Sequence, residues 1–114
     1  MYCMIKYMAL DFDISKIEGF EWDPGNIDKN KLKHSVNKEE CEEVFLNQPL
    51  SIYDDEIHSG TEKRYGALGK TNKERHLVVF FTIRENKIRV ISARVQGKKD
   101  RKIYGKIEEY YRKR

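Results

Sequence analysis

The chain is poor in the residues that build disulfide scaffolds, metal centres and membrane spans. It contains two cysteines and two prolines among 114 residues. Cys3 and Cys41 are too few for a disulfide framework, and no CxxC or HxxE spacing predicts a metal site. The longest apolar run, residues 77–81, is far shorter than the roughly 20 residues of a membrane span, and no secretory signal is recognisable. We therefore expect a soluble cytoplasmic protein that has no metal, no cofactor and no membrane contact.

Negative charge is scarce in the last third of the chain. Residues 84–114 contain twelve Lys or Arg and four Asp or Glu, a net charge of +8, whereas the first 83 residues carry a net charge of −4. A basic end of this kind is typical of proteins that bind a polyanion, most commonly through its phosphates. The composition, 37% charged and 39% hydrophobic, indicates a small domain with much solvated surface, or one whose apolar surface a partner completes.

The length favours one domain, and the residue pattern favours an α+β fold. Residues 77–83 form a continuous run of β-forming residues, typical of a central strand that is covered on both faces. A turn at Glu85-Asn86 leads into the partner strand. We expect an antiparallel sheet with helices packed on one side. The predicted strands cover residues 20–22, 50–53, 64–69, 77–83 and 87–95, and the predicted helices begin at residues 24, 37 and 98.

Local signals support two of these helices. Asn37 and Glu40 have the spacing of a capping box at the start of the second helix. Cys41, Val44 and Phe45 form its apolar stripe. The last helix has an apolar and aromatic stripe that consists of Ile103, Tyr104, Ile107, Tyr110 and Tyr111.

Three arginines on predicted strands are the main candidates for phosphate binding. Arg64 opens one strand, and Arg89 and Arg94 lie on another. Arginine stays charged and can hold phosphate with two parallel N–H groups, although strand arginines often form only salt bridges on a sheet. Since positions 89 and 94 differ by an odd number, regular alternation places them on opposite faces unless a bulge re-aims one of them.

Four further residues are candidates for contact with RNA. Trp22, beside the first helix start, could stack on a base or belong to the core. Lys98, Lys99 and Arg101 begin the basic last helix, which could bind RNA or an acidic partner, or could be only a solvated helix face.

Several short motifs occur in a recognisable order. They are residues 20–24 (FEWDP), 30–34 (NKLKH) with Val36, 43–45 (EVF), Asp55, 58–59 (HS), 62–64 (EKR), Gly69 and 88–94 (IRVISAR). In this combination the chain resembles the BrnT family of ribonuclease toxins from bacterial type II toxin–antitoxin systems, from about residue 20 to residue 104. That family usually has glycine after its Lys-His pair, where this chain has Ser35.

The resemblance implies a RelE-like fold, with a small antiparallel sheet, two N-terminal helices and one basic C-terminal helix. It implies an endoribonuclease that cleaves mRNA and inhibits translation. It also implies a cognate antitoxin with a ribbon–helix–helix DNA-binding part, in a 2:2 heterotetramer that binds operator DNA. On this basis we expect residues 20–114 to form a single BrnT-like toxin domain. Residues 1–19 lie outside the resemblance, and we expect them to be an N-terminal extension that is partly disordered, since Met4 and Met8 are possible alternative starts.

RNA can be cleaved without a metal ion when its own 2′-OH attacks the neighbouring phosphorus. The protein must then remove one proton, neutralise charge on the phosphate and protonate the leaving 5′ oxygen. In this hypothesis the arginines and a nearby lysine hold the phosphate, and histidines exchange protons. Glu62 is either a base or a group that orients Arg64. The catalytic candidates are Lys33, His34, His58, Glu62, Arg64, Arg89 and Arg94, and the RNA-binding candidates are Trp22, Lys98, Lys99 and Arg101.

Two other classes of protein fit the same sequence. One is a non-catalytic module that binds RNA, DNA or an acidic peptide through the basic helix and the strand arginines. The other is an interaction protein whose sheet and basic helix are completed by a second chain. A nuclease site requires the guanidinium groups of separate strands to meet on one surface.

Overall fold

The computed structural model describes residues 13–27 and 35–113. The chain is helical over residues 24–27, so a helix starts at Pro24 as predicted, whereas the candidates Lys33 and His34 lie outside the described residues. In the described part of the chain, no helix is long and apolar enough to cross a membrane. The named elements, in chain order, are η2 (Ile14–Lys16), β1 (Gly19–Glu21), α2 (Lys38–Leu46), β2 (Ser51–Asp54), β3 (Tyr65–Lys70), β4 (His76–Arg84), β5 (Lys87–Val95) and α3 (Lys98–Arg112).

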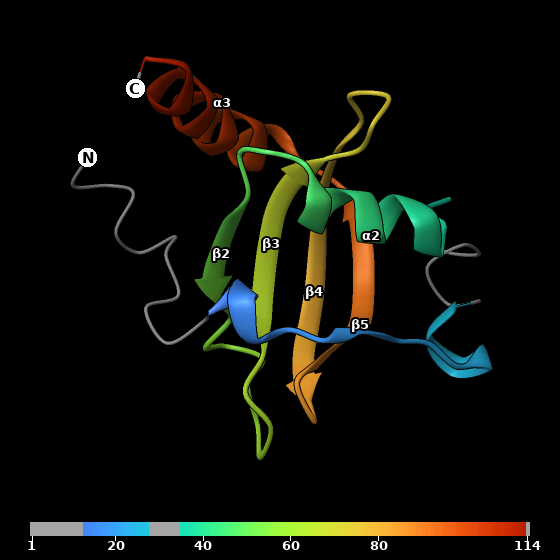
Figure 1. Cartoon of the computed structure of the whole chain (residues 1–114). Coiled ribbons are helices and arrows are strands. Elements are labelled where there is room, and N and C mark those ends of the chain that lie inside the picture. Colours follow the sequence, from blue (N-terminus) through green and yellow to red (C-terminus); the bar gives the residue numbers. More distant parts are fainter. Residues whose placement is uncertain (1–12, 28–34, 114) are drawn as a thin grey trace.

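The five strands form one sheet in the order β1-β5-β4-β3-β2. Figure 1 shows β2, β3, β4 and β5 side by side. The pairs β2–β3, β3–β4 and β4–β5 are antiparallel, as predicted. β1 is instead parallel to β5, with Phe20 opposite Ile88, so the sheet is mixed. The prediction of a wholly antiparallel sheet was wrong at this edge. The chain passes through α2 and three strands between β1 and β5, a connection long enough for a parallel pair.

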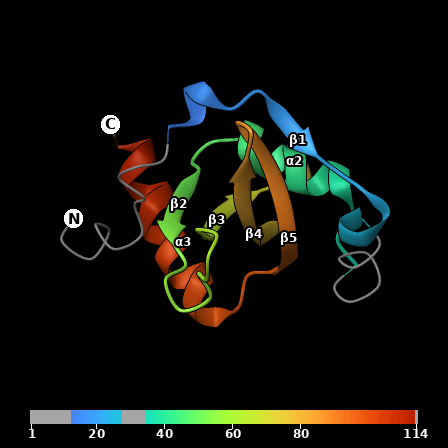
Figure 2. The same ribbon diagram turned by 90° about the horizontal axis from the view of Figure 1, so that it is seen from below.

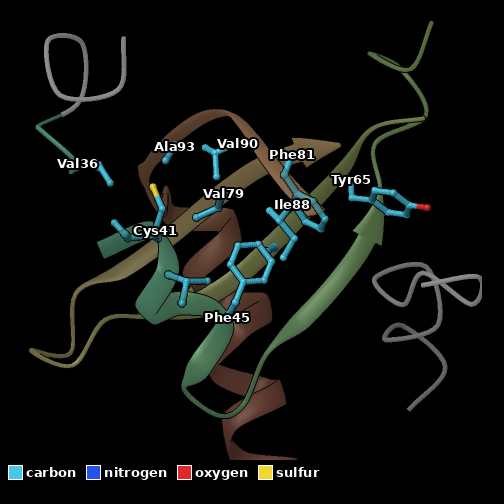
Figure 3. Close-up of a cluster of buried hydrophobic side chains, with 12 residues drawn as sticks. Val36, Cys41, Phe45, Tyr65, Val79, Phe81, Ile88, Val90 and Ala93 are labelled. Carbon is cyan, nitrogen blue, oxygen red and sulfur yellow. The ribbon is translucent and has the colours of Figure 1, made fainter. Parts of the chain in front are cut away.

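α2 covers one face of the sheet and forms the main core with it (Figure 3). The predicted capping box is confirmed, because the side chains of Asn37 and Glu40 each accept a hydrogen bond from the other residue's N–H, at 2.8 and 3.1 Å. The buried residues of α2 are Cys41, Val44 and Phe45, as the stripe predicted. Burial raises the pKa of the Cys41 thiol to about 12, so this thiol is a neutral core group.

α3 lies on the opposite face of the sheet from α2 (Figure 2). Its Tyr104 is fully buried against Leu68 and Val78. The expectation that all helices pack on one side was wrong, because successive strand residues point to opposite faces and β3 and β4 are apolar on both. Tyr110 and Tyr111, near the end of α3, are exposed and do not join the buried stripe.

Ser35 has a left-handed backbone conformation, with a φ of 54°. This is the position at which the resembling family usually has glycine, the residue that adopts positive φ without steric cost. We expect Ser35→Gly to raise the free energy of unfolding by about 0.5–1 kcal/mol, measured by chemical denaturation. Ser35→Ala is the matched control, because it removes the hydroxyl but keeps Cβ. Equal gains from both variants would show that backbone strain is not the cause.

Candidate functional site

β5 contains a bulge that changes which of its side chains share a face. The β4–β5 register shifts between Phe80 and Phe81, where β5 contributes Ile91 as an extra residue. Arg89 consequently lies opposite Thr82 of β4, and Arg94 lies opposite Val78. These two β4 positions are four residues apart and point to the same face, so both arginines point to the face that α3 covers in part. We call this surface the α3 face. Regular alternation predicted opposite faces for these two arginines, and the bulge is the exception that the prediction allowed.

Phe80 lies on β4, the central strand, between two of the arginines. The guanidinium carbon of Arg64 is 5.5 Å from the centre of the Phe80 ring, and that of Arg94 is 5.7 Å from it. The cross-strand neighbours of Phe80 are Gly66 and Ser92, and neither has a side chain long enough to cover the ring. Guanidinium groups from the start of β3 and from β5 therefore meet at one aromatic ring.

Asp55 joins Arg64 to His58. Its carboxylate lies 3.2 Å from Nε of Arg64 and 3.0 Å from Nδ1 of His58, and Asp55 is only 8% exposed. The backbone of this loop is also fixed, because the Asp55 N–H donates to the carbonyl oxygen of Arg64 at 2.9 Å. The Ser59 hydroxyl donates to the carbonyl oxygen of Asp55 at 2.8 Å. One buried carboxylate thus sets the positions of a histidine and an arginine.

Both partners of Asp55 keep atoms that can meet a ligand. A carboxylate at Nδ1 favours hydrogen on that nitrogen, which leaves Nε2 of His58 as a proton acceptor. The His58 side chain is 62% exposed. The Arg64 side chain is 25% exposed, although its Nε is buried and ion-paired with Asp55. The arrangement suits proton transfer beside a bound phosphate.

Arg89 is more strongly neutralised than the other two arginines. It forms ion pairs with Asp23 at 2.8 Å and with Glu21 at 3.0 Å. The hydrogen bond from Arg89 holds the pKa of Asp23 below its ordinary value, and the same bond raises the pKa of Arg89. Arg89 therefore lies on the α3 face with its charge already balanced by two carboxylates.

We expect Arg89→Gln to raise the pKa of Asp23 toward its ordinary value of 3.8, measured by NMR of the carboxyl carbon. Because the pKa of folded Asp23 is depressed, the pair stabilises the fold above the unfolded pKa. This contribution is lost as the pH falls through the lower, folded pKa. Arg84→Gln is the control, since it should raise the pKa of Glu62 and raise that of Asp23 much less, because Arg84 interacts with Asp23 only through a weaker charge–charge attraction. An unaltered Asp23 pKa in Arg89→Gln would contradict the assignment.

Glu62 binds Arg84 and not Arg64. Its carboxylate accepts hydrogen bonds from Nε and Nη2 of Arg84 at 2.8 and 3.1 Å, and the contact lowers the pKa of Glu62. The alternative that Glu62 orients Arg64 was wrong, because Asp55 takes that position. A carboxylate with a lowered pKa is also a weaker base, so Asp55 and His58 are better placed for proton transfer near Arg64.

Arg94 connects the α3 face to the first turn of α3. Its Nη1 lies 2.9 Å from Oδ2 of Asp100, and the same oxygen accepts a hydrogen bond from the Gly97 N–H at 3.0 Å. The Arg94 side chain is nevertheless 39% exposed. The predicted RNA-binding residues of this turn are all exposed: Lys98, Lys99 and Arg101.

Trp22 lies away from the α3 face. Its Nε1–H donates to Glu42 of α2 at 2.8 Å, and its ring packs against the α2 core. The structure therefore does not bring Trp22 together with Arg64 and Arg94. Of the two predicted alternatives for this residue, core packing is the one observed.

Two members of the site were missed from sequence. Asp55 and His58 both appear among the motifs of the family resemblance. Their spacing of three residues could have identified Asp55 as a partner of the histidine. Phe80 belongs to a continuous apolar run, and nothing in the sequence separates it from the core residues beside it. In the described ranges, no group of three or more His, Cys, Asp or Glu side chains could hold a metal ion.

These features define a small α+β domain that carries arginines of separate strands on its α3 face. The family model described as "Ribonuclease toxin, BrnT, of type II toxin-antitoxin system" matches residues 22–100, and the chain belongs to this family. A comparison with curated proteins finds no match. Family membership gives RNA as the substrate class and a cognate antitoxin as the partner. It favours a ribonuclease toxin over a non-catalytic module or an interaction protein.

Proposed function

We propose that this toxin cleaves mRNA at the α3 face without a metal ion, and that this cleavage inhibits translation. The observation that supports the proposal best is the carboxylate of Asp55, which holds both His58 and Arg64. Arg64 in turn shares the Phe80 ring with Arg94. A proton acceptor and two cations thus follow one another along a short path, as cleavage by the RNA's own 2′-OH requires.

The proposed chemistry begins with the 2′-OH of the RNA. Nε2 of His58 takes its proton while the oxygen attacks phosphorus, so that the bond from phosphorus to O2′ forms and the bond to O5′ breaks. The products are a 2′,3′-cyclic phosphate and a 5′-OH. A positioned base contributes about 10²–10⁴-fold. Arg64 and Arg94 stabilise the charge that develops on the phosphate, which is usually the largest single effect.

The remaining candidates have supporting roles in this proposal. Lys33 adds positive charge, and His34, which is protonated before the reaction, donates its proton to the leaving 5′ oxygen. Arg89 contributes less than the other two arginines, because two carboxylates balance its charge. The exposed basic residues at the start of α3 guide the RNA strand toward Arg94 by long-range attraction, which added salt weakens. These residues are Lys98, Lys99 and Arg101.

We also propose that the cognate antitoxin has a ribbon–helix–helix part and forms a 2:2 heterotetramer with the toxin in the cytoplasm, where the complex binds operator DNA. Membership in the toxin–antitoxin family supports this partner. Native mass spectrometry of the co-expressed pair measures the stoichiometry. A complex with one copy of each chain would contradict the proposed assembly.

Cleavage of a single-stranded RNA by the purified toxin in excess chelator tests the proposed reaction. We expect cutting to persist and the 5′ fragment to end in a 2′,3′-cyclic phosphate, detected by mass spectrometry. Arg64→Ala purified by the same procedure controls for a contaminating nuclease. Cutting that stops in chelator and returns with added Mg²⁺ would contradict metal independence. Fragments that end in a 3′-OH would contradict attack by the 2′-OH.

A further inference from the structure

We propose that Phe80 is a stacking platform for one unpaired nucleobase, and that the toxin therefore binds single-stranded RNA in preference to duplex RNA. The inference rests on the proposed function, which places RNA on the α3 face. It adds the class of RNA that this face selects.

The exposure of Phe80 sets it apart from the buried aromatic residues of the α2 core, which are Phe45, Tyr65 and Phe81. Phe80 is half-buried, whereas Phe81, the next residue on β4, is fully buried on the other face. Its cross-strand neighbours, Gly66 and Ser92, are small residues, and the guanidinium groups of Arg64 and Arg94 lie over the ring. Phenylalanine is among the residues most often buried, so a half-buried ring held between two arginines points to a ligand.

The two arginines beside the ring indicate what kind of ligand this is. Arg64 approaches from the start of β3 and Arg94 from β5, so cations flank the ring on both neighbouring strands. A polynucleotide places each base between two phosphates, and proteins bind single strands by combining aromatic platforms with a basic path for the backbone. An acidic peptide has no flat aromatic face at the corresponding place.

The platform fits an unpaired base and not a duplex. Bases within a helix are stacked on one another and present only their edges, whereas single strands can turn a base onto an aromatic ring. Phenylalanine has no hydrogen-bonding group, so Phe80 holds the face of a base without identifying it. The Tyr53 ring occupies the space above Gly66, beside Phe80, and so limits the platform to a single base on that side.

Binding of a fluorescein-labelled 2′-O-methyl oligoribonucleotide, which cannot be cleaved by 2′-OH attack, tests this inference at constant salt. The oligonucleotide is used as a single strand and as a duplex. Phe80→Leu keeps an apolar side chain under α3 but removes the aromatic face, and Phe80→Trp keeps that face. We expect Phe80→Leu to weaken single-strand binding by about 5- to 150-fold, with duplex binding unchanged. Phe80→Trp should retain wild-type affinity, and thermal unfolding verifies that each variant is folded.

Two results with the Phe80→Leu variant would overturn the platform. One is wild-type affinity of Phe80→Leu for the single strand, and the other is an equal loss for single strand and duplex. Equal affinity of the wild type for the two RNA forms would also overturn it, and this measurement needs no variant. If Phe80→Leu binds RNA like the wild type while Arg64→Ala loses cleavage, the stacking role of Phe80 is contradicted and the proposed nuclease function stands. If both variants bind and cleave RNA like the wild type, the stacking role and the proposed function are both contradicted.

Discussion

Arg64→Ala is expected to reduce the rate of RNA cleavage by about 10²–10³-fold, the usual effect of removing one preorganised donor from a charged transition state. Arg64 is the arginine best placed for this role. Its side chain is 25% exposed, and its carboxylate partner Asp55 also holds His58. Single-turnover rates at saturating toxin measure the chemical step apart from RNA binding.

Arg84→Ala is the matched control for this prediction. Arg84 is an arginine of the same sheet whose side chain is 48% exposed and bound to Glu62. We expect a rate close to that of the wild type, because removing an exposed ion pair leaves Asp55 and Phe80 in place. Equal losses in the two variants would show that overall positive charge, and not the position of Arg64, determines the rate. A wild-type rate in Arg64→Ala would exclude this residue from the site.

The elements that could be predicted from sequence are those specified by residues close together in the chain. The β4–β5 hairpin is one example, because Glu85 and Asn86 adopt φ values of 52° and 65°, as a two-residue type I′ turn requires. The capping box at the start of α2 is another. In both cases the contacts that determine the backbone lie within four residues, so the pattern of residue types is sufficient.

The arrangement of faces and edges depends on contacts between distant residues, and sequence alone did not define it. The extra residue Ile91 reverses the alternation along β5, and no residue type marks that position. The parallel pairing of β1 with β5 and the packing of α3 opposite α2 likewise depend on contacts between residues that are far apart in the chain. Arg89 and Arg94 therefore share a face against the expectation for a regular strand.

The choice between two carboxylates shows the same dependence within the site. Glu62 lies two residues from Arg64 in sequence, whereas Asp55 lies nine residues away. The antiparallel pairing of β2 with β3 places Asp54 opposite Tyr65, so the next pair beyond the strand ends is Asp55 with Arg64. Strand register, and not distance along the chain, thus selects the carboxylate that orients the arginine.

Asp55→Asn is expected to reduce the rate of cleavage by about 10²–10⁴-fold, the range for loss of a positioned base. Asparagine has nearly the same shape as aspartate but no charge, so the ion pair with Arg64 is lost. The amide can also turn its NH₂ group toward Nδ1 of His58, which favours the tautomer with hydrogen on Nε2 and removes the proton acceptor. Single-turnover rates measure the effect, and chemical denaturation verifies that the variant is folded.

A double-mutant cycle with His58→Ala separates positioning from a general structural effect. If Asp55 acts through His58, Asp55→Asn should slow the His58→Ala variant much less than it slows the wild type. Asp54→Asn is the matched control, because Asp54 is the adjacent carboxylate and is paired with the exposed Lys63 at 3.4 Å. It should leave the rate unchanged. Fully additive losses in the cycle would contradict action through His58, since a group that orients a base has no effect on the reaction once that base is absent. Asp55 would then act only through Arg64 or by stabilising the loop, and an equal loss in Asp54→Asn would contradict any specific role of Asp55.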